Sequence, residues 1–553
     1  MSRLLLLAAL TFTAVVAQQP SVTIKNGTVR GVELPQFNQS IFLGIPYAQP
    51  PIGDLRLRPP RSINSSFGTI DATAYGPHCW SKFTTGFDDN SGFNNSEDCL
   101  TLNVIRPAGV SEKSLVPVVF WIHGGGLGDF RYNGSWLVES SIANGKPIVF
   151  VSINYRLASL GFLGGKALES QGSLNLGLHD QRLALHWVQE NIAQFGPKVT
   201  IQGQRYENRR ASSVHAHIVA YAGRDDKLFN QAIAESGSGG NYTAADSPTF
   251  QANYDALLAN TTCASTADSS VTTQLSCLRS LPIDDFRESS TGATGIVFDG
   301  DFINVPGTFQ AYKSGKWVKV AFLTGSNSDE GRSFASGGAN TTADVIALLN
   351  TSVPATAMDG LLALYPDIPS LGVPYHTGDF QLDPFQNGAF FTPGLQNKRV
   401  ASIVGDLRQA AGPRFIAQHA SSEVPFYKYR FNHKPYSVSF SVEDFIGHFT
   451  EMGYVFNLQN NDTDFWITNH FTATYLGPTA PIEDRFLGVY MSRAWASFIA
   501  TGDPNNANVP SKITWPKYSE GQENMVWQTQ GSTTEKDNFR QRQMQFIMDN
   551  ILL

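Results

Sequence analysis

Consecutive glycines follow an apolar run in residues 116–126, whose sequence is VPVVFWIHGGG. Glycines let the backbone turn so that several N–H groups point into one cleft, where they can stabilise a tetrahedral oxyanion. A glycine-rich turn on its own is weak evidence, because many loops contain one. Its position directly after a β-branched and aromatic run is more specific, and it predicts a site for oxyanion chemistry at the end of a strand.

Two later segments carry an acid and a histidine that could work with this turn. Residues 325–331 read GSNSDEG after a strand-like run, and residues 445–451 read FIGHFTE. A carboxylate such as that of Glu330 can orient a histidine such as His448 and stabilise its imidazolium. Each residue alone is weak evidence, since loop acids are usually solvated and most histidines are structural. Their order in the chain, after the glycine turn, is that of α/β-hydrolases.

The nucleophile that such a pair requires is missing from its expected place. Residues 197–204, PKVTIQGQ, predict a short strand that runs into a glycine turn, where a hydrolase would continue as G-x-S-x-G. Here Gly203 and Gln204 are followed by RYENRR, so Arg205 stands where the serine belongs and Glu207 where the second glycine belongs. A side chain at the glycine position disfavours the strained turn that exposes a nucleophile.

Strand-like and helical patterns alternate along the chain. Apolar runs predict buried strands, and apolar residues at helical spacing predict helices between them. Continuous apolar strands separated by helices indicate one α/β domain with a mostly parallel central sheet and helices on both faces. Ligands of such sheets bind beyond the carboxyl ends of the strands. The predicted strands are residues 116–122, 147–154, 199–201, 229–236 and 319–324, and the predicted helices are 179–194 and 211–221.

Composition and the N-terminus restrict the class of protein. The 553 residues carry a net charge of −7 without a long basic run, which argues against a nucleic-acid partner. Residues 1–17 combine Arg3, an apolar stretch and a small-residue cleavage site, which predicts a secretory signal peptide. The alternative, a membrane anchor, is disfavoured because the apolar run is short for a bilayer, and no later stretch predicts a transmembrane segment. We therefore expect a secreted, extracellular protein.

Cysteines and sequons agree with secretion. Ten N-x-[ST] sequons, from Asn26 to Asn461, suit a glycoprotein. The four cysteines fall into two local pairs, and in an oxidising compartment we expect disulfides between neighbours. Free buried thiols are the alternative, and no ligand spacing predicts a metal site. The expected bonds are Cys79–Cys99 and Cys263–Cys277.

Several motifs together resemble the type-B carboxylesterase/lipase family, which includes cholinesterases and fungal extracellular lipases. They are FLGIPYA at residues 42–48, EDCLTLNV at 97–104, NLGLHDQ at 175–181 and TGDPN at 501–505. The resemblance covers the mature chain, residues 18–553, and implies an α/β-hydrolase fold and no cofactor. It also implies that Glu330 is the triad acid, His448 the general base, and Gly125 and Gly126 two oxyanion donors.

The departure from the family pattern is confined to one place. The family usually reads G-[EQ]-S-A-G at the elbow, whereas here Gly203 and Gln204 match and six residues replace Ser-Ala-Gly. Another serine could serve only if it lay within hydrogen-bond reach of the base. Ser212 and Ser213 are predicted to lie in the following helix, and Ser236 to end the next strand.

Two hypotheses follow for function. In the first, the gene product is a secreted carboxylic ester hydrolase, and residues 205–210 are a local alteration such as a misplaced intron boundary would produce. In the second, the chain is a catalytically inactive esterase-like protein that acts by binding or adhesion. For the chain as it reads, we expect no ordinary serine-esterase turnover. The sequence favours an apolar acyl or aryl ester, since Leu127, Phe130, Phe449 and Tyr454 are expected to line the pocket, and it does not indicate an oligomeric state.

Overall fold

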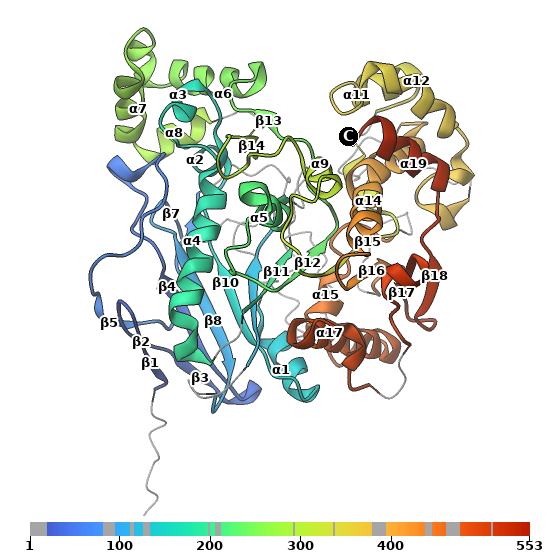
Figure 1. Cartoon of the computed structure of the whole chain (residues 1–553), viewed down its shortest axis with the longest axis horizontal. Coiled ribbons are helices and arrows are strands. Elements are labelled where there is room, and N and C mark those ends of the chain that lie inside the picture. Colours follow the sequence, from blue (N-terminus) through green and yellow to red (C-terminus); the bar gives the residue numbers. More distant parts are fainter. Residues whose placement is uncertain are drawn as a thin grey trace, which may run out of the picture.

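A central sheet organises the molecule in the computed structural model (Figure 1). The structure describes residues 19–80, 94–110, 116–124, 133–196, 199–204, 212–290, 294–335, 338–378, 394–436, 445–459, 476–509 and 513–553. Eleven strands pair in the order β18-β17-β16-β15-β12-β11-β9-β10-β8-β4-β3. In chain order they are β3 (Val32–Leu34), β4 (Gln39–Pro46), β8 (Thr101–Pro107), β9 (Val118–Ile122), β10 (Val149–Ile153), β11 (Val199–Gln204), β12 (Gln231–Glu235), β15 (Ala321–Asn327), β16 (Phe426–Phe431), β17 (Glu523–Trp527) and β18 (Thr533–Lys536).

The strands from β10 to β17 are all parallel, as the sequence predicts. Every residue of β9 is buried, which explains its continuous apolar sequence VVFWI. From β9 the chain passes to β10 on one side and then crosses to β11 on the other side. The strand order therefore reverses at β9, and a crevice at such a switch point is the usual ligand site of an open α/β sheet.

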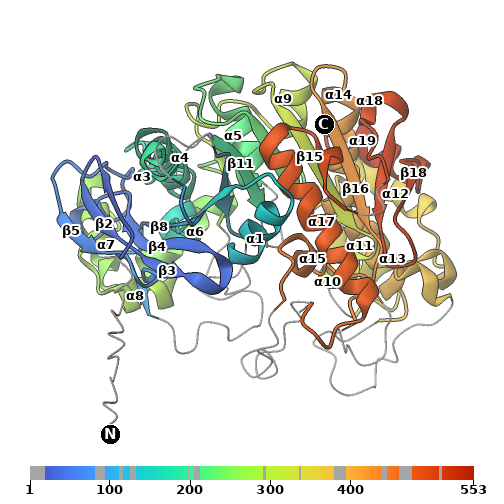
Figure 2. The ribbon, with the colours of Figure 1, turned by 90° about the horizontal axis from the view of Figure 1, so that it is seen from below.

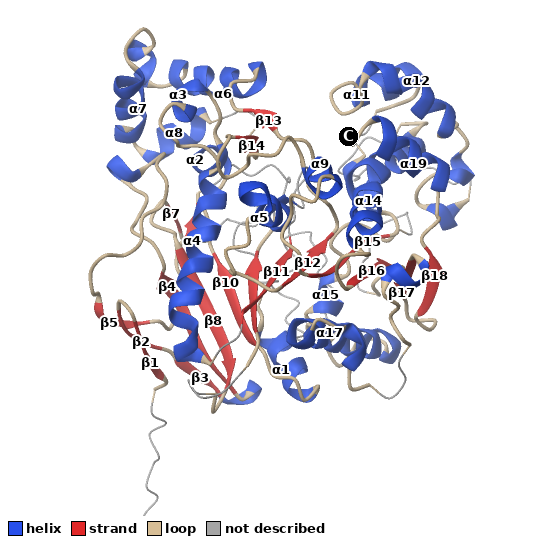
Figure 3. Cartoon of the chain, viewed as in Figure 1, coloured by secondary structure: helices blue, strands red, loops and turns tan. Residues whose placement is uncertain are grey.

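Helices cover both faces of this sheet (Figures 1 and 3). Two large hydrophobic clusters lie between helices and sheet, one on each face. The first face carries α4 (Leu176–Asn191), α5 (Ser212–Gly223), α9 (Thr308–Lys313), α13 (Asn397–Gly405), α14 (Ala411–Ala420) and α19 (Gln541–Asn550). The second carries α1 (Ser135–Ala143), α15 (Met452–Val455) and α17 (Ile482–Thr501).

The edges of the sheet are antiparallel, and the sequence did not predict these strands. β8, β4 and β3 extend one edge, and β18 closes the other beside β17. Only three residues form β3 and four form β18, so neither gives a periodic signal long enough to recognise. A separate small sheet joins β1 (Ser21–Ile24), β2 (Gly27–Arg30) and β5 (Gly68–Asp71).

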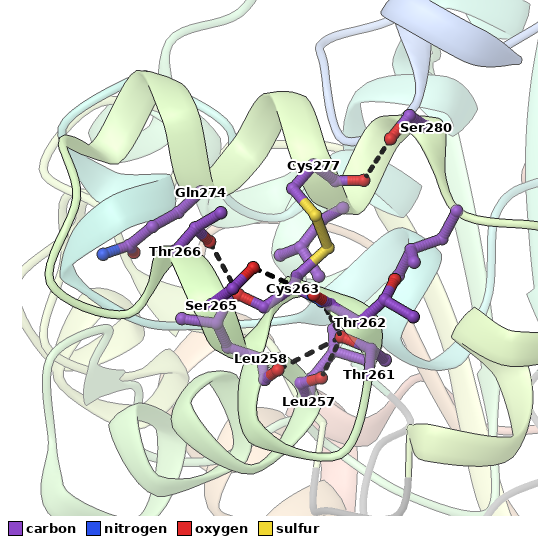
Figure 4. Close-up of a disulfide and its surroundings, with 12 residues drawn as sticks. Leu257, Leu258, Thr261, Thr262, Cys263, Ser265, Thr266, Gln274, Cys277 and Ser280 are labelled. Atoms are coloured by element: carbon purple, nitrogen blue, oxygen red, sulfur yellow. Dashed lines mark hydrogen bonds between the residues drawn. A yellow bond between two sulfur atoms is a disulfide. The ribbon is translucent and has the colours of Figure 1, made fainter.

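A smaller helical lobe lies beyond one end of the sheet and has its own hydrophobic cluster. It consists of α2 (Ala158–Phe162), α3 (Lys166–Glu169), α6 (Pro248–Ala259), α7 (Val271–Ser280) and α8 (Ile283–Ser289). The disulfide Cys263–Cys277 ties α7 to the turn before it (Figure 4). The second disulfide joins Cys79 to Cys99, so both bonds connect the pairs that the sequence predicts.

Three further helices border the site or its surroundings: α10 (Glu330–Phe334), α11 (Thr342–Leu349) and α12 (Ala355–Leu364). Figure 2 shows α17 and α15 packed along one side of the strands, with α10 near their ends. Within the part of the chain that the structure describes, no helix has the length and apolar character needed to cross a membrane. The predicted signal peptide, residues 1–17, lies outside the described residues.

Candidate active site

The carboxyl ends of β9 and β11 lie side by side. Gly203 of β11 pairs with Ile122 of β9 on one side and with Ala234 of β12 on the other. The next residue of β11, Gln204, pairs with Glu235. The seven residues that follow, from Arg205 to the start of α5, lie outside the described residues. The elbow strand is therefore formed and correctly placed, although the nucleophile segment itself is not seen.

A tyrosine holds the first part of the glycine turn by a hydrogen bond. The hydroxyl of Tyr155 donates to the carbonyl oxygen of His123 at 2.8 Å, and the two rings stack with centroids 4.7 Å apart. The turn thus begins at the strand end that the sequence predicts. Gly125 and Gly126, the predicted oxyanion donors, lie outside the described residues.

Glu330 and His448 form a buried pair. The Nδ1 atom of His448 lies 2.6 Å from Oε2 of Glu330, and neither side chain is more than 4% exposed. Because a carboxylate can only accept, Nδ1 carries the proton and the other ring nitrogen, Nε2, is left as the basic atom. The residues that sequence analysis singled out, 118 positions apart, are brought together in the geometry of an acid that orients a base.

The acid is fixed by two further hydrogen bonds. Its Oε1 atom accepts from the backbone N–H of Asn327, at 2.6 Å, and from the hydroxyl of Ser236, at 2.7 Å. The histidine is fixed as well, since its backbone N–H donates to the Ser333 hydroxyl and its ring lies 4.7 Å from that of Phe334. Asn327 ends β15, Ser333 and Phe334 lie in α10, and Ser236 directly follows β12, so the ends of two neighbouring strands and one short helix position the pair.

Ser236 does not occupy the place of a nucleophile. Its hydroxyl donates to the carboxylate of Glu330, on the Nδ1 side of His448, whereas a base would take a proton through Nε2. Ser213 lies elsewhere, with its buried hydroxyl accepting from Gln181 of α4. The side chain of Ser212 is outside the described residues. Ser236 is instead a hydrogen-bond donor that holds the acid.

Asp329, the neighbouring carboxylate, ties two segments together. Its Oδ2 atom accepts from the backbone N–H of Ile446, and its own N–H donates to the Ile446 carbonyl. The segment that carries His448 is thereby attached to the loop after β15. Asp329 consequently supports the histidine loop, and Glu330 is the acid that contacts the ring.

Two more glutamates are buried at the site, and sequence analysis missed both. Asn327 Nδ2 donates to Glu451 at 2.5 Å, and the Trp495 indole of α17 donates to Glu235 at the same distance. Burial raises the pKa of the Glu451 carboxyl to about 7, with a further rise from the charge of Glu330. Burial, and then the charge of Glu451, hold the pKa of Glu235 well above its ordinary value.

The sequence carried a usable signal for one of these two acids, Glu235. Glu451 follows His448 by three residues, and Glu235 ends a strand whose middle residues, Ala232 to Ala234, are apolar. A charged residue at the end of a buried strand is unusual, and it could have marked Glu235 as a candidate. Glu451 has no such signal, because its loop contains other polar residues.

One pocket prediction is wrong. Tyr454 was expected to line an apolar pocket, but its ring packs 5.2 Å from that of Phe431 and its hydroxyl donates to Asp484. Phe449 is buried in the same hydrophobic cluster. The other two predicted lining residues, Leu127 and Phe130, lie outside the described residues.

Known proteins with similar sequences and structures are esterases and lipases. Residues 18–547 match the Carboxylesterase family. The chain is 33% identical to Lipase 4 of Diutina rugosa, over 95% of both chains. It is 32% identical to Secreted lipase 1 of Botryotinia fuckeliana, over 96% of this chain and 92% of that one. Among solved structures, EstA of Aspergillus niger superposes with a TM-score of 0.79 at 25% identity, covering 97% of this chain and 99% of that one.

Proposed function

The chain belongs to the carboxylesterase family and has the α/β-hydrolase fold, and from that premise we propose that it derives from a secreted carboxylic ester hydrolase with a Ser-Glu-His mechanism. Glu330 is the acid of this mechanism and His448 the general base. Gly125 and Gly126 are the oxyanion donors. The serine is missing from the elbow, where Arg205 follows Gln204.

The observation that supports this most strongly is the 2.6 Å contact between Glu330 and His448. Both side chains are buried. The pair lies at the ends of β15 and β16, the two strands that follow β12 in the sheet. A buried acid–histidine pair is costly to keep unless its geometry is held, and three groups hold this one.

With a serine at position 205, each residue has a defined task. Nε2 of His448 takes the hydroxyl proton as the oxygen attacks the ester carbonyl, and Glu330 stabilises the resulting imidazolium. The same histidine then returns the proton to the leaving alcohol. An arginine at this position cannot supply the nucleophile, and its positive charge near His448 would disfavour the imidazolium.

Substrate and location follow from the relatives. Relatives are described as lipases, and three of them as secreted, one from Botryotinia fuckeliana and two from Gibberella zeae. We propose that the substrates of the present chain are likewise esters, with an apolar acyl group. Residues 1–17 serve as the signal peptide, and residues 18–553 form the hydrolase domain. No cofactor takes part, because the reaction needs only the triad and the oxyanion donors.

The test compares two forms of the protein. The chain as it reads should not hydrolyse a short p-nitrophenyl ester above background, and a serine-directed phosphonate should not label it. Replacing residues 205–210 with Ser-Ala-Gly should restore both turnover and labelling, since removing the nucleophile of a serine protease costs about 10⁶-fold in rate. Sequencing the transcript across residues 199–214 would independently reveal an altered intron boundary.

The matched control is the repaired chain with His448→Ala, which should lose turnover while it keeps its fold. If the repaired chain stays inert, the second candidate function becomes the better one: an inactive esterase-like protein that acts by binding or adhesion. The observation that favours this alternative is Arg205 itself, together with Tyr206 and Glu207 in the elbow. Stoichiometric labelling of the unrepaired chain would contradict both hypotheses and identify another nucleophile.

A further inference from the structure

The surface around α11 and α12 holds almost half of the exposed large apolar side chains. Thirteen such side chains are exposed in the described part of the chain, and six of them lie between residues 346 and 395. Figure 1 shows α11 and α12 at the outer edge of the molecule. Exposed apolar residues are ordinary when scattered, but a concentration of them calls for a partner or a cover. The six are Ile346, Leu348, Ile368, Leu371, Tyr375 and Leu395.

Few charged side chains accompany these residues. Between residues 338 and 378 the sequence has no lysine or arginine, and its acids are Asp344, Asp359 and Asp367. The carboxylate of Asp344 is already used, because it accepts from the backbone N–H and the hydroxyl of Thr341 in the capping box that starts α11. Charged side chains therefore contribute little to the solubility of this surface.

An N-x-[ST] sequon follows α11 directly. Its residues, Asn350-Thr351-Ser352, are all exposed, and the Asn350 amide makes no hydrogen bond to the described part of the chain. The backbone of Asn350 has helical angles (φ −58°, ψ −23°), so Asn350 extends the last turn of the helix. Residues three and four apart on a helix are neighbours, so Asn350 continues the exposed stripe of Ala343, Ile346 and Ala347. We call these three residues the apolar face of α11.

The sequon at Asn26 shows the contrast. The Nδ2 atom of Asn26 donates to the carbonyl oxygens of Ile63 and Ser65, at 3.2 and 3.3 Å, so both of its N–H bonds are used. A sugar on that nitrogen replaces one of these hydrogens and takes its place against residues 63–65. A chain with a glycan there would lose a hydrogen bond when it folds, whereas a glycan on Asn350 disturbs no contact.

We propose that Asn350 carries an N-linked glycan and that this glycan covers the apolar face of α11. The sugar comes from an oligosaccharide on a lipid pyrophosphate. The bond between C1 of its first sugar and the pyrophosphate oxygen breaks, C1 bonds to Nδ2 of Asn350, and one amide proton and the lipid pyrophosphate are released. A glycan is bulky and solubilising, so it supplies what the side chains of this surface lack. The inference rests on the secretion proposed above, and it does not depend on the missing nucleophile.

The test of the site uses the full chain, expressed with its own signal peptide in a eukaryotic host. Enzymatic release of N-glycans in water enriched in heavy oxygen converts each glycosylated asparagine to a labelled aspartate, which peptide mass spectrometry locates. We expect the label at Asn350 and not at Asn26. A secreted chain without label at Asn350 would overturn this inference alone. A chain that stays inside the cell without any label would overturn the proposed secretion as well.

Matched substitutions test the cover. Ser352→Ala removes the sequon but keeps Asn350, so the variant should lose one glycan and self-associate at a protein concentration roughly tenfold lower, as sedimentation velocity measures. Thr28→Ala removes the Asn26 sequon in the same way, and it should change neither the number of glycans nor the association. Adding Ile346→Ser to Ser352→Ala should reverse the association.

A second measurement keeps the cover testable if Ser352→Ala folds poorly. The purified unmodified chain and the purified Ile346→Ser chain are both stripped of glycans by enzyme, and only the first should associate more than before. If Ser352→Ala loses a glycan but associates no more than Thr28→Ala, the glycan does not cover the apolar face of α11. Equal association of the two stripped chains would contradict the proposal for the same reason.

Discussion

On the α17 side of β15, three glutamates are buried around a single histidine, whereas on the α14 side Asp537 lies between Arg414 and Lys428. The side chains of both groups are buried. Burial raises the pKa of Glu235 and of Glu451, and a neighbouring carboxylate raises each further, that of Glu451 for the first and that of Glu330 for the second. Burial would also raise the pKa of Asp537, but the charges of Lys428 and Arg414 hold it well below its usual value.

The difference separates a reactive site from a structural one. A carboxyl group with a raised pKa makes the site sensitive to pH and to the charge on His448, which suits acid–base chemistry. A carboxylate between two cations keeps its charge at every ordinary pH and joins α14 to β16 and the segment after β18. Four substitutions test this contrast, and they are ordered by expected size of effect.

Glu330→Gln in the repaired enzyme should have the largest effect. The amide keeps the shape, but it neither stabilises the imidazolium nor fixes the tautomer of His448, and an equivalent change in a serine protease lowers kcat about 10⁴-fold. Steady-state hydrolysis of a p-nitrophenyl ester measures the loss. Glu451→Gln is the control, because Glu451 does not contact the ring in the way Glu330 does, and a comparable loss there would contradict the assignment of the acid.

Asp537→Asn should cause the largest loss of stability. It leaves the buried side chains of Arg414 and Lys428 without a counter-charge, and breaking a buried pair in this way costs about 3–5 kcal/mol. Urea unfolding at pH 7 measures the change. The exposed pair of Lys25 and Glu190 supplies the control, since Glu190→Gln should change stability by less than about 1 kcal/mol. Similar values for the two variants would mean that the Asp537 cluster is effectively solvated.

Glu451→Gln should change how stability depends on pH. The carboxyl has a pKa of about 7 when folded and 4.5 as the ordinary value, so the folded state holds a proton that the unfolded state has lost between these pH values. The extra proton contributes fully to the free energy of unfolding below pH 4.5. Between pH 4.5 and about 7 this contribution falls by roughly 1.4 kcal/mol for each unit of pH, until it is lost. The glutamine variant should lack this decline.

The Glu451→Gln variant and the unmodified chain are compared by measuring their free energies of unfolding at pH 5, 6, 7 and 8. Glu235→Gln should flatten the same profile, because the pKa of Glu235 is raised for the same reason. Asp537 predicts the opposite slope: its pKa is lowered, so its contribution is present above pH 3.8 and is lost as pH falls below that value. A profile for Glu451→Gln that parallels the unmodified chain would show that this carboxyl is ionised when folded.

Ser236→Ala should have the smallest effect. The Ser236 hydroxyl donates to Glu330 at 2.7 Å, so its removal weakens the hold on the acid but leaves the bonds from Asn327 and to His448. We expect kcat of the repaired enzyme to fall about tenfold, which corresponds to about 1.4 kcal/mol. A shift in the pH–rate profile should accompany the loss, since the carboxylate becomes less well solvated. A complete loss of phosphonate labelling would instead identify Ser236 as the nucleophile.

Sequence alone determined the fold class and the acid–histidine pair. Parallel strands such as β9 and β12 are buried on both faces, and their continuous apolar runs are visible without any partner. The strands at residues 116–122 and 229–236 were therefore placed within two residues of their observed ends. Glu330 and His448 were found because their motifs occur in the chain order of α/β-hydrolases, and the family resemblance gave their roles.

Only the tertiary structure decided what surrounds these residues. Ser236 and Glu330 are 94 positions apart, and Arg414 and Asp537 are 123 apart, and no local pattern connects either pair. Whether a buried carboxyl meets a cation, a hydroxyl or another carboxyl depends on which segments pack together. A pKa depends on those neighbours within a few ångströms, so the reactive and the structural acids of this protein look alike in sequence and differ only in the fold.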